Sequence, residues 1–567
     1  MNLRIATVSL AVLSFLSTSG LVFSQPPPPP PPPPAIPPLP PVQAPPGNAI
    51  TTTKANLGKA LFWDEQLSST GTVSCGTCHV PSKGGSDPRS IIGVTRNPGF
   101  DNVFGNADDV TGSPGVIYNN AAGTYPWHSV FGLGAQVTGR KAPSVINAAL
   151  APVLFWDGRA DPVFNDPLTN AIVLTNGAAL ETQVVSPPTN TGEMACIGRT
   201  WTDIATNIAA ARPLALSPSV PAALTTYINN RTYPALFQEA FGSAGVIPAR
   251  IAMAIATYER TLYSNQAPID SFIAGQNVLN ASELRGMALF GQIDCAACHT
   301  GGGFSDGQFH YIGVRPNTED SGHFGVTANA DDRGAFKTPS LRNVSLRPPY
   351  MHTGRFATLA DVVEFYNRGG DFNAANKDPR VRPRNLTAQQ KTDLVAFLNT
   401  FTDPRVAAET APFDHPTLFA GSSRAAQLLS TGMAGAGGMI PEVIAIEPPI
   451  AGNPSFTVGV TKALGGAQAV LVIDATDPGP DAAYPATAAL TRTTVTMLGS
   501  GAGNGYGSYS VQIPSDQSWV GRELYGRWFV ADSAAVGHVA ASKAFKIAIF
   551  GIGTTATATG PMGFVTY

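Results

Sequence analysis

The sequence predicts a mainly α-helical chain built from two similar halves, followed by an all-β domain. Three observations lead to this fold class. One short cysteine and histidine pattern occurs twice, each copy follows an apolar segment with helical spacing, and from about Ile440 the chain changes to short β-branched runs separated by Gly, Pro and Asp. We therefore expect the two helical halves and the β-rich tail to fold as separate domains.

Length and composition agree with a globular protein of several domains. The chain has 567 residues, of which 43% are apolar and 13% charged, and it contains 58 Gly and 50 Pro. A chain of this length is expected to form about three or four units, each with its own core. The formal net charge is −3, so the sequence lacks the excess of Lys and Arg that binding to nucleic acid or to an acidic membrane surface requires.

The N-terminus predicts export. Arg4 precedes an apolar run from Ile5 to Phe23, which is typical of a signal peptide over residues 1–24. Residues 25–50 are rich in proline and are expected to form an extended linker. No later stretch is apolar enough to span a bilayer. We expect a periplasmic or secreted protein without a transmembrane segment.

Four of the five cysteines form two copies of the C-x-x-C-H motif. The copies are Cys75-Gly-Thr-Cys78-His79 and Cys295-Ala-Ala-Cys298-His299. Two thiols one helical turn apart can bond to the two vinyl groups of a porphyrin, and the following His is left to ligate the iron. The sequence therefore predicts two covalently bound haem c groups, with His79 and His299 as proximal ligands. The fifth cysteine, Cys196, is expected to be a buried free thiol.

These motifs define two c-type cytochrome domains. Leu57 to Phe62 precedes the first motif and Gly286 to Phe290 the second, so a short amphipathic helix is expected before each haem. Thr387 and Gln390 form a capping box, which predicts a further helix that ends the second domain. We expect the first cytochrome domain over residues 51–245, the second over residues 246–420 and a linker over residues 421–440.

The tail, residues 441–567, is expected to be a β-sandwich accessory domain. Runs such as Ser455 to Val460 and Ala469 to Ile473 have the length and β-branched content of strands. The tail contains no Cys and one His, His538. It is therefore expected to dock to a partner or a surface rather than to carry catalysis.

Ordered matches around the two haem motifs resemble the bacterial di-haem cytochrome c peroxidase family. That family also contains the tryptophylquinone-maturing protein MauG and, more distantly, di-haem rubber oxygenases. The resemblance covers roughly residues 55–405. The matching segments are Leu57-Gly58-Lys59, Lys141-Ala142-Pro143-Ser144, Phe155-Trp156-Asp157-Gly158-Arg159-Ala160, Leu180-Glu181-Thr182-Gln183, Glu193-Met194, Thr338-Pro339-Ser340-Leu341-Arg342-Asn343, Tyr350-Met351-His352-Thr353-Gly354 and Tyr366-Asn367-Arg368-Gly369-Gly370. The resemblance implies two helical cytochrome domains that meet at an interface with a bound calcium ion, near Arg347 to Pro349.

For the first haem, the resemblance implies a distal carboxylate at Glu181, which would move a proton during peroxide cleavage. About twenty residues, Asp161 to Ala179, are inserted before it. Leu154 stands where many relatives carry a Gln, so the pocket is expected to be more apolar. No His lies between His79 and His128, which favours an open first haem.

For the second haem, the resemblance implies that Tyr366 is the sixth iron ligand, as in MauG-like members, where peroxidases carry Met. Met351 and Met194 remain alternatives. Trp127 and Trp156 are both candidates for an aromatic relay between the haems, and spacing alone does not decide between them.

The expected function is a peroxide-dependent oxidoreductase that reduces hydrogen peroxide. The electrons would come from a small donor protein, a cytochrome c or a cupredoxin, or from an oxidised protein substrate. A di-haem electron carrier without enzymatic activity and a rubber-oxygenase-like dioxygenase are the alternatives. Glu181 argues against the dioxygenase, whereas Leu154 favours it.

Overall fold

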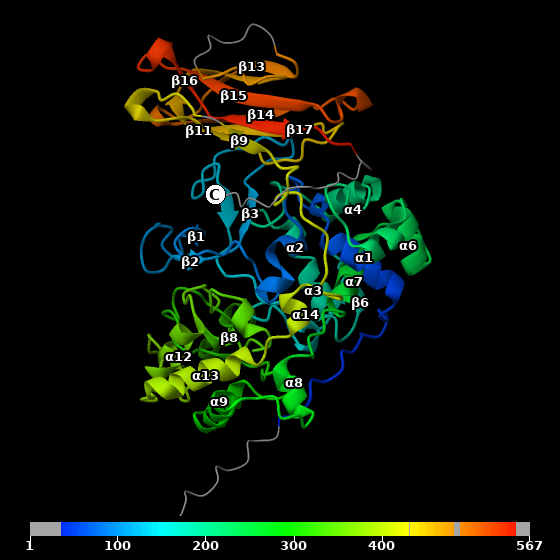
Figure 1. Ribbon diagram of the computed structural model, residues 1–567, viewed down its shortest axis with the longest axis vertical. Helices are drawn as coiled ribbons and strands as arrows, with labels where there is room; N and C mark the ends of the chain where they lie inside the picture. The colour runs from blue at the N-terminus through cyan, green and yellow to red at the C-terminus, as the bar shows by residue number, and fades with distance from the viewer. Residues whose placement is uncertain (1–35, 430, 481–487, 552–567) are drawn as a thin grey trace, which may run out of the picture.

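The computed structural model describes residues 36–429, 431–480 and 488–551. The expected signal peptide and the first part of the proline-rich linker lie outside these residues. The molecule is elongated, with a strand-rich domain at one end and two helical domains below it along the long axis (Figure 1). In the described part of the chain, no helix is both long and apolar enough to cross a membrane.

The first helical domain surrounds the first C-x-x-C-H motif. Its core is a cluster of buried side chains from helices α1, α4, α6 and α7, among them Leu61, Ile208 and Ile255. Helix α7 belongs to this core although it begins after residue 245, where the sequence analysis ends the first domain. The helices and strands of this domain are α1 Thr52–Phe62, α2 Cys75–Cys78, β1 Arg96–Asn97, β2 Val110–Thr111, β3 Pro114–Ile117, β4 Ala135–Val137, β5 Phe164–Asn165, β6 Ile172–Leu174, α3 Ala179–Val184, α4 Trp201–Ala210, α5 Ala222–Ile228, α6 Tyr233–Phe241 and α7 Pro248–Glu259.

The second helical domain repeats this plan around the second motif. Its core contains apolar side chains of α9, α12 and α13, including Phe290, Phe365 and Phe397. The predicted capping box is present: the N–H of Gln390 donates to Thr387 Oγ1 and the N–H of Thr387 donates to the Gln390 side chain. The elements are α8 Pro268–Ile273, α9 Ala281–Gln292, α10 Cys295–Cys298, β7 Phe309–His310, α11 Phe324–Thr327, β8 Phe336–Lys337, α12 Leu359–Asn367, α13 Ala388–Asn399 and α14 Pro404–Ala407.

The two halves share a helix crossing that depends on glycine. Gly58 of α1 lies against α7, where an added Cβ would come within 1.9 Å of the Ala254 carbonyl oxygen. Gly286 of α9 lies against α13, where a Cβ would come within 2.0 Å of the Asp393 carbonyl oxygen. Any side chain at these positions would force the helices apart. The internal repeat predicted from the sequence, with a helix before each motif, is confirmed.

The C-terminal domain is rich in strands, as predicted. One antiparallel sheet has the order β10-β11-β14, and a second has the order β13-β12-β15-β17-β9, with β16 paired to β15. A single hydrophobic cluster includes Phe456 of the first sheet and Leu471 and Trp528 of the second. β9 lies within residues 421–440, so this segment supplies an edge strand of the second sheet. The strands are β9 Gln427–Leu429, β10 Glu442–Ile444, β11 Phe456–Gly465, β12 Gln468–Asp474, β13 Thr491–Thr496, β14 Gly501–Val511, β15 Glu523–Ala531, β16 Val539–Ala541 and β17 Ala544–Ala548.

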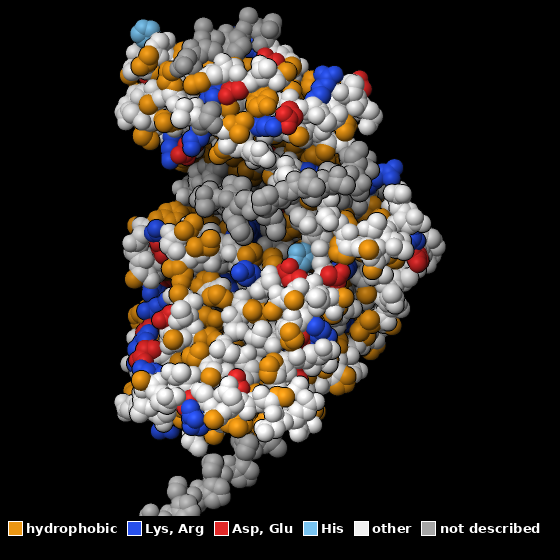
Figure 2. All heavy atoms as spheres, in the orientation of Figure 1, with side chains coloured by type: hydrophobic (Ala, Val, Ile, Leu, Met, Phe, Trp, Pro, Cys, Tyr) orange, Lys and Arg blue, Asp and Glu red, His pale blue; other side chains and the backbone are white. Residues whose placement is uncertain are grey.

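The strand-rich domain packs on the first helical domain through the loop that follows β3. The Tyr125 hydroxyl donates to Glu447 Oε1 at 2.8 Å, and both side chains are buried. The Trp127 ring lies 4.6 Å from that of Tyr506 on β14. On the face drawn in Figure 2, basic and acidic side chains are interspersed over all three domains, which agrees with the small net charge of −3.

Candidate functional site

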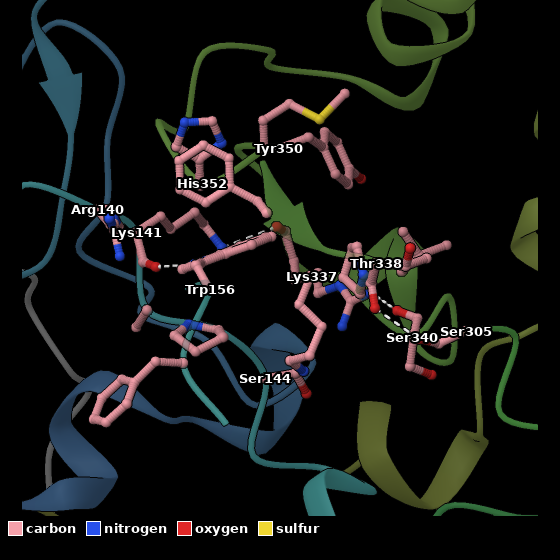
Figure 3. Close-up of a pocket in the computed structure, with 18 of the residues that line it drawn as sticks. Arg140, Lys141, Ser144, Trp156, Ser305, Lys337, Thr338, Ser340, Tyr350 and His352 are labelled. Atoms are coloured by element: carbon pink, nitrogen blue, oxygen red, sulfur yellow. Dashed lines mark hydrogen bonds between the residues drawn. The ribbon is translucent and has the colours of Figure 1, made fainter. Parts of the chain in front are cut away.

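A cavity of about 1140 Å³ lies between the two helical domains, and both C-x-x-C-H motifs line it. It is larger than the pockets of roughly 300–1,000 Å³ that usually hold one small ligand. Its walls come from both domains, with residues of α3 and the segment around Trp156 from the first domain and residues of β8 and α12 from the second. Figure 3 shows Trp156 and Lys337 among the side chains that line it. The predicted proximal ligands, four cysteines and Tyr366 all line this cavity.

The two motif histidines are held in the same way. His79 Nδ1 lies 3.1 Å from the Gly85 carbonyl oxygen, and His299 Nδ1 lies 3.1 Å from that of Phe304. A carbonyl oxygen can only accept, so Nδ1 carries the proton and the lone pair of Nε2 is free for iron. Burial lowers the pKa of His79 and lowers that of His299 to about 4. Both imidazoles are therefore neutral, as iron ligation requires.

The four motif cysteines suit attachment of haem. Helices α2 and α10 each place their two cysteines one turn apart, and none of the five cysteines forms a disulfide. Burial raises the pKa of Cys295 to about 12 and that of Cys78 well above its usual value. Burial therefore keeps these sulfurs as neutral thiols, available for bonding to a haem. Cys196 is also a free thiol, but it is half-buried rather than buried.

Buried cations on the cavity wall provide a second test of haem binding. Lys337 and Arg347 line the cavity, and within the described residues neither forms an ion pair with a carboxylate. Burial lowers the pKa of Lys337 to about 8 and that of Arg347 to about 10. Buried cations are rarely left without an anion. The propionate carboxylates of two haems would supply the missing negative charge, so the residues present fit the predicted cofactor.

Glu181, the expected distal carboxylate, does not line the cavity. Its helix α3 turns Leu180, Gln183 and Val184 toward the cavity, and this i, i+3, i+4 spacing leaves Glu181 on another face. Both of its oxygens accept from Arg260 at 2.8 Å, and Oε1 also accepts from Asn48 at 2.7 Å. A carboxylate fully engaged in this way is a structural anion, and the geometry does not support the expected role.

Two acidic side chains that act on Cys75 of the first motif line the cavity: that of Glu259, whose pKa burial raises to about 8, and that of Glu193. Glu193 lies in the segment between α3 and α4. Two backbone hydrogen bonds hold the turn at Glu193. The N–H of Glu193 donates to the Asn190 carbonyl at 3.1 Å, and the Glu193 carbonyl accepts from the N–H of Val116 at 3.1 Å. Burial raises the pKa of Glu193 above its ordinary value, and the charge of Arg159 offsets part of this effect. A carboxyl with a raised pKa at a cavity wall can act as a proton carrier. The sequence signal for this residue is the matched pair Glu193-Met194, to which the resemblance assigns no proton-transfer role.

Tyr366 lies on α12, which starts at a capping box formed by Thr358 and Asp361. Its side chain lines the cavity beside the second motif. Burial, and next the nearby thiols of Cys295 and Cys298, raise the pKa of the Tyr366 phenol. The alternative ligands Met351 and Met194 also line the cavity. The geometry therefore keeps all three side chains within the candidate site.

The two tryptophans differ in position. Trp156 lines the cavity between the motifs, and its indole Nε1 donates to the Lys141 carbonyl at 2.8 Å (Figure 3). The Trp156 carbonyl accepts from the N–H of Lys337 on β8 at 2.9 Å, which joins the two domains at this point. Trp127 instead packs against the strand-rich domain and is 46% exposed. Of the two candidates, the structure brings only Trp156 to the haem motifs.

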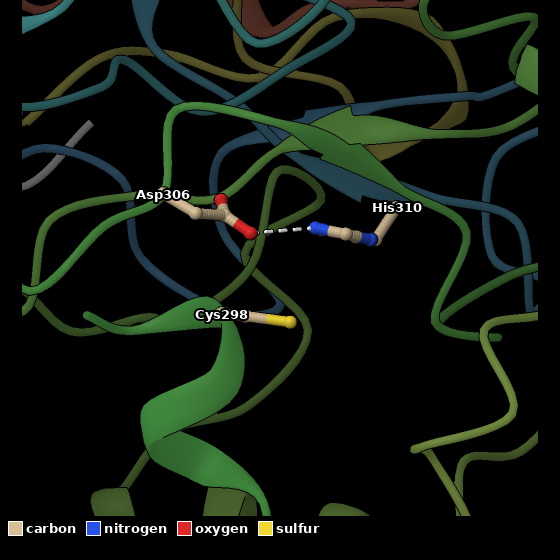
Figure 4. A group of neighbouring side chains, drawn as sticks. All are labelled: Cys298, Asp306 and His310. Carbon is tan, nitrogen blue, oxygen red and sulfur yellow. Dashed lines mark hydrogen bonds and ion pairs between the residues drawn. The ribbon is translucent and has the colours of Figure 1, made fainter.

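One side-chain cluster next to the second motif has the composition of a metal site. Cys298, Asp306 and His310 offer ligand atoms that all lie within 4.8 Å of one another (Figure 4). His310 Nε2 lies 3.0 Å from Asp306 and its Nδ1 lies 2.9 Å from Asp378. Cys298 belongs to the C-x-x-C-H motif, where its sulfur is needed for haem attachment. We therefore assign the cluster to the edge of the second haem site.

Comparison with known proteins identifies the family of the chain. The family model for di-haem cytochrome c peroxidase matches residues 52–278, and the model for cytochrome c matches residues 284–402. The chain is 33% identical to the methylamine utilization protein MauG of Methylorubrum extorquens over 66% of this chain and 84% of that protein. It is 28% identical to the cytochrome-c peroxidase IdrP1 of Pseudomonas sp. strain SCT over 73% of this chain and 98% of that protein. Among solved structures, a MauG-like protein associated with microbial copper homeostasis is 25% identical, with a TM-score of 0.47, over 66% of this chain and 96% of that chain.

Proposed function

The chain belongs to the di-haem cytochrome c peroxidase family, and on this premise we propose that it is an exported haem peroxidase that reduces hydrogen peroxide. The observation that carries the proposal is the cavity shared by both C-x-x-C-H motifs, which also contains the carboxyl of Glu193. An electron carrier needs the two motifs but has no use for a buried proton carrier at a pocket wall. The related proteins named as peroxidases support the same reaction class.

The cofactors of this proposal are two haem c groups. Cys75 and Cys78 would hold the first and Cys295 and Cys298 the second, with Nε2 of His79 and His299 directed at the two irons. When bound, the haems supply the redox chemistry and an open iron site for peroxide. The remaining tasks belong to the polypeptide, which must carry protons, exclude water and hold the two groups at a fixed separation.

Proton transfer is assigned to Glu193. Reduction of hydrogen peroxide takes up two electrons and two protons and releases two molecules of water. The oxygen–oxygen bond breaks readily only if the leaving oxygen receives a proton. Glu193 lines the cavity without a hydrogen-bond partner for its carboxyl among the described residues, so it can take the proton from one peroxide oxygen and return it to the other. Leu154, which also lines the cavity, keeps this wall apolar.

Electron transfer between the haems is assigned to Trp156, and the sixth ligand of the second haem is assigned to Tyr366. Trp156 lines the cavity between the two motifs and is held by hydrogen bonds from both domains. A phenolate ligand stabilises ferric iron more than a thioether does and so lowers the reduction potential. This arrangement favours storing oxidising equivalents until a donor arrives.

The donor is proposed to be a small cytochrome c or cupredoxin, or a protein substrate that becomes oxidised. Export to the periplasm or the outside of the cell would bring the enzyme to such partners. The two sheets of the tail share one hydrophobic cluster, which supports a β-sandwich. This domain would dock the enzyme to a partner or a surface.

The test is steady-state reduction of hydrogen peroxide by the haem-loaded protein with reduced cytochrome c as the donor, together with an EPR spectrum of the resting protein. We expect turnover and one high-spin with one low-spin haem. Two low-spin haems without turnover would contradict the proposal and would favour an electron carrier. Turnover of a polyisoprene with dioxygen but not of peroxide would instead indicate a dioxygenase.

A further inference from the structure

Lys141 places a buried ammonium group at the junction of the two helical domains. Lys141 is only 4% exposed. Its Nζ donates to Ser86 Oγ at 2.5 Å and to the Arg347 carbonyl at 3.2 Å. Ser86 lies in the loop after the first haem motif, whereas Arg347 belongs to the second domain. One side chain therefore connects the two domains through its charge.

The backbone of Lys141 makes two further links at the same place. Its N–H donates to the His352 carbonyl at 2.7 Å, and its carbonyl accepts from the indole of Trp156 at 2.8 Å (Figure 3). Trp156 is the tryptophan that lies between the haem motifs. The position of Lys141 thus fixes the part of the cavity wall that carries Trp156.

The resemblance predicts a calcium ion near Arg347 to Pro349, and the residues present do not fit one. Calcium takes about six to eight oxygen ligands, usually with carboxylates among them. The Arg347 carbonyl already accepts from Lys141. The carboxylate whose charge acts on Lys141 is that of Asp87, and both of its oxygens accept from Arg89. Within the described residues, one cluster of side chains could ligate a metal, that of Cys298, Asp306 and His310, and it lies at the second haem motif.

Charge leads to the same conclusion. Burial, and next the charge of Arg347, lower the pKa of Lys141 to about 7. Below this pH a divalent cation at the junction would lie beside the Lys141 ammonium, and it would lie beside the Arg347 guanidinium up to about pH 10. Without additional carboxylates, the repulsion between these groups and the cost of removing calcium from water would not be offset. The Lys141 side chain is covalently attached to the chain, so its positive charge requires protonation but no metal-binding equilibrium.

We propose that the ammonium of Lys141 takes the place of the calcium ion at the domain junction, so that the arrangement of the two haem sites is independent of calcium. Lys141 acts here as a positioning residue, since it holds Trp156 and the Arg347 segment rather than touching peroxide. The proposal does not depend on peroxidase activity, because an inactive protein without calcium would still satisfy it.

The first experiment measures calcium in the purified, haem-loaded protein by inductively coupled plasma mass spectrometry, and then adds EGTA or calcium chloride during thermal unfolding followed at the haem absorption band. We expect far less than one calcium per chain, and the same unfolding midpoint in all three conditions. One calcium per chain, or a midpoint that EGTA lowers, would overturn the proposal.

The second experiment compares Lys141→Met with Lys141→Asn. The Met variant removes the ammonium, and we expect its unfolding midpoint to fall by about 5 °C or more, with an altered resting EPR spectrum. The Asn variant removes the charge but offers an oxygen ligand, so we expect added calcium to raise the midpoint of this variant alone. Lys337→Met, on the same cavity wall, is the matched control and should not respond to calcium.

Two results with the Lys141 variants would contradict the proposal. A Lys141→Met protein with an unchanged midpoint and spectrum would show that the ammonium positions nothing. A Lys141→Asn protein that calcium does not stabilise would show that Nζ does not occupy a cation site. Either result would overturn the proposal. If the Met variant does not fold, the calcium content of the unaltered protein still decides the question.

Discussion

Arg260 donates to both carboxylate oxygens of Glu181 at 2.8 Å, and the two side chains are 2% and 0% exposed. This buried ion pair joins α3 to the end of α7 on the side of α3 that faces away from the cavity. Both Glu181 oxygens are satisfied in this charged pair, so the geometry favours a structural role for Glu181 over proton transfer. The carboxyls of Glu193 and Glu259 do line the cavity, and we assign the peroxide chemistry to Glu193.

The first prediction concerns Glu193→Gln. Gln is nearly isosteric with Glu but cannot carry a proton, so the rate of reaction with peroxide should fall by about a hundred- to ten-thousand-fold. Stopped-flow mixing with hydrogen peroxide, followed at the haem absorption band, measures this rate. Haem content and thermal stability should stay unchanged, because Glu193 forms no ion pair in the described structure.

Glu181→Gln is the matched control for this experiment. It leaves the buried Arg260 without its anion, which typically destabilises a protein by about 3–5 kcal/mol. We expect a lower unfolding midpoint but an almost unchanged peroxide rate in the fraction that is folded and loaded with haem. If Glu181→Gln slows the reaction and Glu193→Gln does not, the assignment of the proton carrier is wrong.

The second prediction concerns haem attachment. Replacing Cys75 and Cys78 together by Ala should remove about half of the haem stain that survives denaturing electrophoresis, because only the thioether bonds keep haem on an unfolded chain. The same pair of changes at Cys295 and Cys298 should have an equal effect. A stain of full intensity in either double variant would contradict covalent attachment at that motif.

Much of this site could be predicted from the sequence because its signals are local. The C-x-x-C-H motifs and the Thr387 capping box depend on residues within one or two helical turns, and the structure agrees with them. The distal carboxyl could not be predicted in this way. Helix α3 spans only Ala179–Val184, too few positions to reveal which face is buried. Its decisive partner, Arg260, lies 79 residues further along the chain, so only tertiary structure shows that Glu181 is already paired.

The third prediction concerns Tyr366. Burial raises the pKa of its phenol, so the side chain stays neutral unless a metal ion takes its proton's place. If it ligates the second haem, the ferric protein lacks the weak far-red band of a Met–iron bond. Tyr366→Phe should then raise the reduction potential of that haem, measured by spectroelectrochemistry. A far-red band that persists in Tyr366→Phe would assign the ligand to Met351 or Met194 instead.

The fourth prediction concerns the contact between the strand-rich domain and the first cytochrome domain. Burial raises the pKa of Glu447 from 4.5 to about 8, although its oxygens accept from the Thr457 N–H and the Tyr125 hydroxyl. The folded protein therefore binds more protons than the unfolded chain between these two pH values. The free energy of unfolding should decrease as pH rises through this window, and the contribution of the neutral carboxyl should be lost above about pH 8.

Glu447→Gln isolates this effect, because it keeps a neutral side chain of the same shape at every pH. Other buried carboxyls with raised pKa values, such as Glu65 and Glu259, affect both proteins equally and cancel in the comparison. Between pH 5.5 and 8.5 the unfolding midpoint of the unaltered protein should fall by about 3 °C or more beyond that of the variant. Glu442→Gln, at an exposed position on β10, is the control and should follow the unaltered protein. Equal slopes for Glu447→Gln and the unaltered protein would mean that Glu447 is already ionised when the domains are packed together.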